Sequence, residues 1–221
     1  MKTYLRFLRR HWKFLGFALL LPFCGSFGQT FYFGLFNDRI RESYSLSHSD
    51  YGTLYALATL LSAFVMMRIG KMVDIANVRV LTLFVFIGMM LGCVGLSYHG
   101  SLGLLVFSIF LLRFCGQSMF NHISTTAVAR SFRHERGRAL SIAFLGNALG
   151  QVLLPGLVVL SFAYMDWTAA WLGAALLLLL LMFPTLWWLL EDKNIHPPAP
   201  TLAEERHELA ERHWTQREVL T

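Results

Sequence analysis

Residues 80–129 read VLTLFVFIGMMLGCVGLSYHGSLGLLVFSIFLLRFCGQSMFNHISTTAVA and contain one charged side chain, Arg113, when histidine is counted as neutral. A helix needs about 20 apolar residues to cross a bilayer, so this run is long enough for two crossings. The segment Tyr98-His99-Gly100-Ser101 is typical of a turn and divides the run in two. The stretch therefore predicts a hairpin of two transmembrane helices.

Uncharged runs on both sides of this hairpin predict four more crossings. The six predicted spans are 14–37, 51–69, 80–98, 102–129, 138–163 and 167–190. The strands of a membrane β-barrel would alternate in polarity, which the leucine run at 176–181 does not. We therefore predict an all-α membrane protein. It has a basic N-terminus (1–13), a six-helix bundle (14–190) and a polar tail (191–221).

The composition of the whole chain is typical of a protein whose surface is mostly in contact with lipid. Hydrophobic residues make up 56% and charged residues 14% of the chain, against roughly 25% charged residues in a soluble domain. The basic residues lie at the ends of apolar runs and form no stripe with aromatics, so no nucleic-acid partner is expected. Cys24, Cys93 and Cys115 fall inside apolar runs without a C-x-x-C pair, so we expect no metal and no cofactor.

The distribution of Lys and Arg predicts the orientation of the chain. Of the 19 such residues, sixteen fall in the N-terminus, the second and fourth connections and the tail, whereas the opposite connections hold only Arg39 and Arg41. Because cytoplasmic connections are enriched in Lys and Arg, both termini are predicted to be cytoplasmic. The expected location is a cell membrane, specifically a bacterial inner membrane.

Arg113 is predicted to lie near the middle of the bilayer. A cation at that depth costs at least about 2.5–3.5 kcal/mol and normally faces a bundle interior or water. Gln117, Phe120 and Ser124 follow it at i+4, i+7 and i+11, which predicts a polar face on this helix. Two interpretations stay open: Arg113 satisfies backbone carbonyls between helices, or it handles a substrate or a proton.

Polar side chains in two other spans predict a shared central cavity. Gln29 and Tyr32 share a face of the first helix, and Asn147 and Gln151 lie one turn apart in the fifth. Each amide taken alone is more typical of an interhelical hydrogen bond. Together with Arg113 and Gln117 they form our predicted substrate-binding set. No acidic residue lies in any span, so the partner of Arg113 could be an anionic ligand, water and carbonyls, or an acid from another polypeptide.

The second connection, residues 70–79, reads GKMVDIANVR. It resembles the signature loop of the major facilitator superfamily, Gly-x-x-x-Asp-(Arg)-x-Gly-Arg-(Arg/Lys). Gly70, Asp74 and Arg79 match, and Asn77 stands where the pattern has its second glycine. Asn tolerates a left-handed φ better than other non-glycine residues, so we expect the exchange to be mild.

Three further segments carry the resemblance, which covers about residues 12–192. Arg113-Phe114-Cys115-Gly116-Gln117 is similar to the family's motif in helix four, and Arg136-Gly137-Arg138-Ala139-Leu140 is similar to its step into helix five. The outer segment Leu46-Ser47-x-x-x-Tyr51-Gly52 is typical of the entry into helix two. The adjacent Gly-Pro of family antiporters is absent from helix five, where Gln151 follows Gly150.

The resemblance implies one half of a twelve-helix transporter, with its six helices arranged as two inverted three-helix repeats. It implies a secondary active transporter that moves a small solute by alternating access. An organic or inorganic anion follows as the substrate if Arg113 contacts it. The residues implied as an inner conformational latch are Gly70, Asp74, Arg79 and Arg130.

The implied partners are a small-molecule substrate, the lipid bilayer and a second six-helix half. That half could belong to the same polypeptide, to a separate chain or to a second copy of a half-size homologue. We do not expect an enzyme, because the spans contain no Gly-x-Ser-x-Gly-like turn. A non-transporting membrane scaffold or sensor is the alternative, and a channel is less favoured because no filter-like segment is present.

Overall fold

The computed structural model describes residues 2–98, 100–132 and 135–189, with backbone only at residues 2–5 and 74–75. These ranges contain helices and turns and no strand. Six helices are long and apolar enough to cross a membrane: Arg6–Gly34, His48–Ile69, Val78–Ser97, Leu102–Ser131, Arg136–Ser161 and Trp167–Leu189. The predicted fold class, an all-α membrane protein with six spans, is confirmed. The predicted tail lies outside the described residues.

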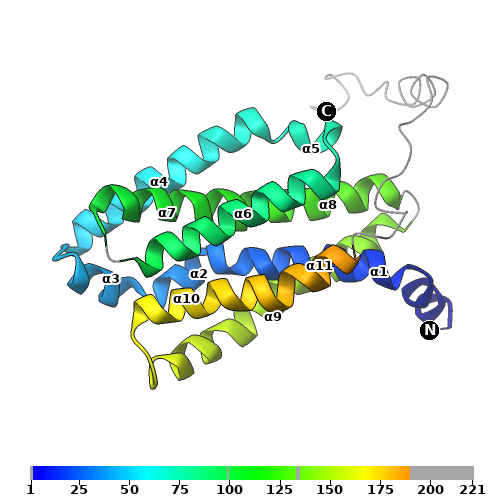
Figure 1. The fold of residues 1–221 in the computed structure, drawn as a ribbon. Coiled ribbons are helices and arrows are strands. Elements are labelled where there is room, and N and C mark those ends of the chain that lie inside the picture. Colours follow the sequence, from blue (N-terminus) through cyan, green and yellow to red (C-terminus); the bar gives the residue numbers. More distant parts are fainter. Residues whose placement is uncertain (1, 99, 133–134, 190–221) are drawn as a thin grey trace, which may run out of the picture.

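The first span lies at the centre of the bundle. It consists of α1 (Lys2–Gly25), a 3₁₀ turn (Ser26–Gly28) and α2 (Thr30–Gly34). The helices of the fourth and fifth spans pack along it, and it is the most buried of the six. The second span, α4 (His48–Ile69), is the least buried and covers one side of the bundle (Figure 1).

Further helices and two π-helical segments make up the rest of the described residues. The bounds of the remaining elements are α3 Asn37–Ser43, α5 Met72–Ile75, α6 Val78–Ser97, α7 Leu102–Leu112, the π-helical η2 Arg113–Phe120, α8 Asn121–Ser131, α9 Arg136–Ser161, α10 Trp167–Leu177, the π-helical η3 Leu178–Met182 and α11 Phe183–Leu189. The fourth span is thus α7, η2 and α8 in one continuous rod, and the sixth is α10, η3 and α11.

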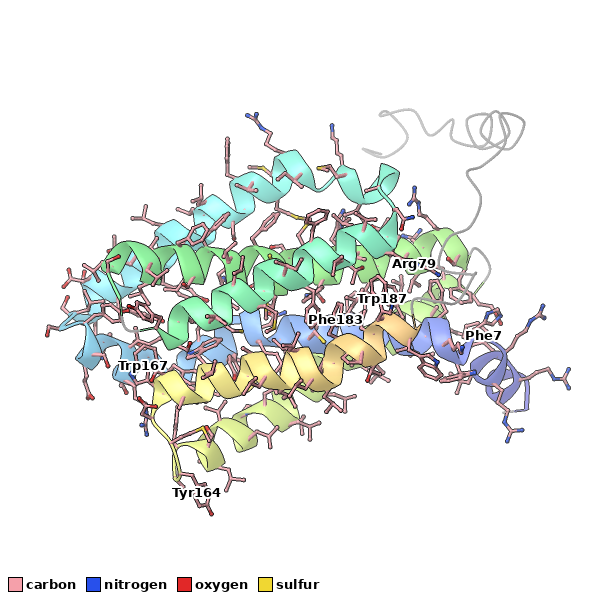
Figure 2. All side chains as sticks on the ribbon, viewed as in Figure 1. Phe7, Arg79, Tyr164, Trp167, Phe183 and Trp187 are labelled. Atoms are coloured by element: carbon pink, nitrogen blue, oxygen red, sulfur yellow. The ribbon has the colours of Figure 1, made fainter. Side chains whose placement is uncertain are left out.

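Successive spans run in opposite directions (Figure 1). The N-terminus, α5 and the end of α8 lie at one end of the bundle, whereas α3, the turn between α6 and α7 and the start of α10 lie at the other. Figure 2 places Phe7 and Arg79 at the first end and Tyr164 and Trp167 at the second. The connections that are rich in Lys and Arg therefore gather at a single end.

Four helices begin at a side chain that accepts a backbone hydrogen bond. Ser47 accepts from the Asp50 N–H at 3.1 Å while Asp50 accepts from the Ser47 N–H at 3.1 Å, which is a capping box at the start of α4. The other three caps are Asn77 for α6, Ser101 for α7 and Asp166 for α10. Because the first N–H groups of a helix have no partner within it, these residues fix where the helices start.

The first helix differs most from its prediction. It begins at Lys2 instead of near residue 14. The charged residues before 14 limit the uncharged run from which the span was predicted, but a helix can continue through charged residues outside the lipid. It is also interrupted at Ser26–Gly28, which the sequence did not indicate. The connection after it contains α3, which was not predicted either.

Candidate functional site

Arg113 lies inside the bundle, between the first, second and fourth spans. Its side chain is 5% exposed. Nη1 donates to the carbonyl oxygen of Gly28 at 3.2 Å and to Oγ1 of Thr30 at 3.1 Å. The guanidinium carbon lies 5.2 Å from the ring centre of Tyr55, which is within the range of a cation–π contact. Nε is buried and has no hydrogen-bond partner.

The interruption of the first helix explains the bond to Gly28. Gln29 is extended, with φ −79° and ψ 154°, so the helical hydrogen bonds are lost there. The N–H of Tyr32, which would bond to Gly28 in a continuous helix, bonds instead to the Gln29 carbonyl at 3.1 Å. Arg113 donates a hydrogen bond to the Gly28 carbonyl, which the break leaves without its helical partner. This contact agrees with the first of the two interpretations, in which Arg113 satisfies a backbone carbonyl between helices. The contact involves only Nη1 of the guanidinium.

Glycines bring the first and fourth spans into backbone contact beside Arg113. A Cβ added to Gly28 would collide with the Leu112 carbonyl oxygen and lie 2.9 Å from Cα of Gly116, and one added to Gly25 would lie 2.5 Å from the Gly116 oxygen. Gly116 is in the middle of the π-helical segment. Only glycine permits this separation of the two helices.

The fifth span packs against the first in the same way. A Cβ on Gly146 would collide with the Leu19 carbonyl, and one on Gly150 would collide with the Ser26 hydroxyl. The spacing Gly146-x-x-x-Gly150 therefore allows the two helices to pack closely. It brings Asn147, on the next position of α9, close to the fourth span.

Two amide side chains connect the fifth span to the backbone of the fourth span at Gln117. Nδ2 of Asn147 donates to Oδ1 of Asn121 at 2.8 Å, and Nδ2 of Asn121 donates to the backbone oxygen of Gln117 at 2.8 Å. Oε1 of Gln117 and Oδ1 of Asn147 are buried and have no partner. The fourth and fifth spans thus present two buried acceptors without partners, and Arg113 presents its buried Nε as a donor without a partner.

Not every predicted substrate residue joins this group. Tyr32 is 3% exposed, and its ring packs against Phe27 at 5.1 Å and Trp171 at 5.2 Å, so it belongs to an aromatic cluster of the core. Gln151 is exposed on α9, and Gln29 is half-buried at the break without capping α2 through its side chain. The structure therefore links Asn147 to Gln117 through Asn121, joins Arg113 to Gly28 and Thr30, and leaves Tyr32 apart from both groups.

The polar face predicted on the fourth helix stops after Gln117. Ser124 is fully buried and donates to the carbonyl oxygen of Ala18 at 2.6 Å, and Phe120 lies in the core. The prediction assumed 3.6 residues per turn. The π-helical turns of Arg113–Phe120 hold more residues per turn and rotate the following residues away from that face.

Three residues of the site were not predicted. Asn121 lies four positions after Gln117, and this spacing could have indicated it. Thr30 and Tyr55 meet Arg113 only because the first helix breaks at Gln29 and α4 packs alongside, and no sequence pattern signals either event. Tyr55 in turn donates to Thr30 at 3.3 Å.

No carboxylate of the described residues pairs with Arg113, since both of its hydrogen bonds go to neutral oxygens. In the same part of the chain, no three His, Cys, Asp or Glu side chains gather as metal ligands would. Arg113 is therefore a buried cation without a counter-ion among the residues that the structure describes.

The fourth span also holds the connection that contains α5. His122 Nε2 lies 3.1 Å from the carbonyl oxygen of Gly70, so this nitrogen carries the proton that is donated. Arg130 Nη1 donates to the Val73 carbonyl at 3.4 Å. The backbone of Asp74 is in α5, and its side chain lies outside the described part of the chain.

Asn77 differs from its expectation. Its φ is −66° and its ψ is 120°, which is not the left-handed region, and its side-chain oxygen accepts the Arg79 N–H at 2.9 Å. Asn77 is the N-cap of α6. An extended residue with a short polar side chain suits that place, and no positive φ is needed there.

Comparison with known proteins gives one match. The family model of the Major Facilitator Superfamily matches residues 18–220. Neither the curated proteins nor the solved structures contain a match.

Proposed function

This chain belongs to the major facilitator superfamily, a family of membrane transporters, and on that basis we propose that it is a secondary active transporter of a small organic or inorganic anion. The observation that carries the proposal is Arg113, a buried guanidinium whose Nε has no partner and which pairs with no carboxylate in the described part of the chain. A buried donor without an acceptor costs about 1–3 kcal/mol, which an anion placed beside it would recover.

The substrate would enter beside Thr30, which is exposed while Arg113 beneath it is not. The acceptors of Gln117 and Asn147 favour an anion that also carries a hydroxyl or another donor, because each buried acceptor then gains a partner. Gln29 and Gln151 stay in the proposed contact set at its edge. Tyr32 is dropped from it because its ring is packed in the core.

The proposed mechanism is alternating access, in which this bundle rocks against a second six-helix half about a site near the midplane. The second half is a further segment of the same polypeptide, a separate chain or a second copy. We propose that both termini are cytoplasmic, because the basic connections share an end with the N-terminus. The inner latch would then comprise the α5 connection with Gly70, Asp74 and Arg79, held by Arg130.

Uptake of labelled carboxylates and phosphate by proteoliposomes that contain the chain with its second half tests the proposal. Arg113→Lys keeps the charge and a donor for Gly28 but loses the free Nε, so the KM should rise roughly 10- to 100-fold, the range expected for a charge-assisted hydrogen bond. Arg113→Ala should abolish uptake. Thermal unfolding of each variant, measured with and without the carboxylate, reports folding and binding separately.

Thr30→Val and Thr185→Val form a matched pair, because both threonines are exposed and only Thr30 contacts Arg113. The first should raise the KM, and the second should leave it unchanged. Unchanged KM and Vmax in a folded Arg113→Ala protein would remove Arg113 from the site. Stabilisation by an anion without uptake, even with the second half present, would support the scaffold or sensor alternative instead.

A further inference from the structure

The start of α1, before the bend at His11, carries three cations on one face. Arg6, Arg9 and Arg10 follow one another at i, i+3 and i+4, the spacing of one side of a helix. We call them the N-terminal cationic face. Its three arginines are exposed, and none of them forms a hydrogen bond or ion pair within the described residues. The first acidic residue of the chain is Asp38.

The structure fixes this segment against the bundle. Phe7 is 5% exposed, and its ring lies 5.5 Å from that of Phe132, which follows α8. His11 packs against the same ring at 5.1 Å. The backbone at His11 is not helical (φ −117°, ψ 20°), so α1 bends between the cationic face and the span. The face is held in place at the end of the bundle, where Figure 2 shows Phe7.

Aromatic side chains indicate that the cationic face lies at the level of the lipid headgroups. Trp12 and Trp188 are 51% and 45% exposed, and their rings lie 5.2 Å apart. Nζ of Lys13 lies 4.8 Å from the centre of the Trp188 ring. Exposed tryptophans of membrane proteins concentrate at the interface between hydrocarbon and water. Lys13 therefore marks the depth at which the interface begins.

We propose that the N-terminal cationic face binds the headgroups of anionic phospholipids in the surrounding leaflet. Three exposed arginines that lack partners offer planar donors of the geometry that suits a phosphate. A leaflet of anionic lipid attracts basic residues next to a span, and the attraction adds up over the residues involved. The aromatic contacts of Phe7 and His11 hold the face in position, so little flexibility has to be lost on binding.

Tryptophan fluorescence tests the proposal on the whole chain in vesicles. The vesicles contain phosphatidylcholine with about 30% phosphatidylglycerol, and either the first or the second lipid is brominated to quench nearby tryptophans. The difference between the wild type and Trp12→Phe isolates the signal of Trp12. Per mole of brominated lipid, phosphatidylglycerol should quench Trp12 several-fold more strongly than phosphatidylcholine, and added salt should reduce this preference.

The variant Arg6→Gln/Arg9→Gln/Arg10→Gln should lose the preference. Per mole of brominated lipid, the two lipids should then quench Trp12 equally. Arg6→Lys/Arg9→Lys/Arg10→Lys keeps the charges that attract the anionic leaflet and orient the chain in the membrane, but it loses the planar donors, so it should retain most of the preference. Arg136→Gln/Arg138→Gln neutralises cations at the same end of the bundle but outside the face, and should retain it too.

Three outcomes would overturn the proposal: equal quenching by the two lipids in the wild type, a preference that survives the glutamine variant, or an equal loss in the Arg136/Arg138 control. The last would mean that the basic end of the protein attracts anionic lipid without a defined face.

Discussion

Gly28 and Gly116 allow the first and fourth spans to touch along their backbones, and this contact positions Arg113 beside the broken helix. Gly28→Ala would put a methyl group onto the Leu112 carbonyl, and backbone cannot move aside as a flexible side chain can. We expect a loss of stability of about 1–3 kcal/mol or more, the usual range for overpacking. Thermal unfolding in detergent measures it.

Gly156→Ala is the matched control. Gly156 lies inside α9, and a Cβ there would meet no atom within 4 Å. The substitution should raise stability by up to about 1 kcal/mol, because alanine restricts the unfolded chain and favours the helix. A Gly28→Ala protein as stable as the Gly156→Ala protein would contradict the close contact.

At the scale of an element, α10 depends on Asp166 for its start. The carboxylate accepts from the Thr168 hydroxyl at 2.7 Å and from the Ala169 N–H at 3.0 Å. Both hydrogen bonds lower the pKa of Asp166 below its ordinary value, and the bond from Thr168 has the larger effect. Since the folded pKa is the lower one, this stabilisation is present above the unfolded pKa and is lost as the pH falls through the folded pKa.

Asp166→Ala should lower the unfolding temperature of the chain at neutral pH, because the first turn of α10 loses its cap. Asp166→Asn keeps an oxygen for the Ala169 N–H, so it should lower this temperature less. Asparagine does not titrate, so the asparagine variant should also lack the fall in stability that protonation of Asp166 causes in the wild type at acidic pH. Equal unfolding temperatures for the alanine variant and the wild type at neutral pH would show that the cap is unimportant.

At the scale of the whole molecule, the alternation of the spans predicts which sites face which side of the membrane. Gly137 is exposed in the first turn of α9, which follows the end of α8, and Tyr164 is 81% exposed at the opposite end of the bundle (Figure 2). Cys24, Cys93 and Cys115 are buried, so single added cysteines can be labelled against a low background. A membrane-impermeant maleimide should label Tyr164→Cys in intact cells and Gly137→Cys only after the cells are opened. The reverse pattern would mean that the chain is inserted with its basic end outside.

The number of spans followed from the sequence because the requirement is local. A run such as 80–98 is long enough to cross lipid whatever it packs against, and the cap residue Ser101 sits beside the turn that divides it from the next helix. The energetic cost of Arg113 was likewise visible in the sequence, because a cation inside an apolar run is costly wherever it points. Its two interpretations could not be separated at that level.

The surroundings of Arg113 were decided by tertiary structure. The break at Gln29 frees the Gly28 carbonyl, and the π-helical turns change the register after Gln117. Both lie where glycines bring the first and fourth spans together, so neither follows from helix periodicity. For this reason Tyr32 is a core residue, and Thr30, Tyr55 and Asn121, which were not predicted from the sequence, belong to the candidate site. The sequence by itself determined how often the chain crosses the membrane, since hydropathy depends on one segment at a time. Which side chains meet depends on contacts between segments far apart in the chain, and only the folded bundle decided that.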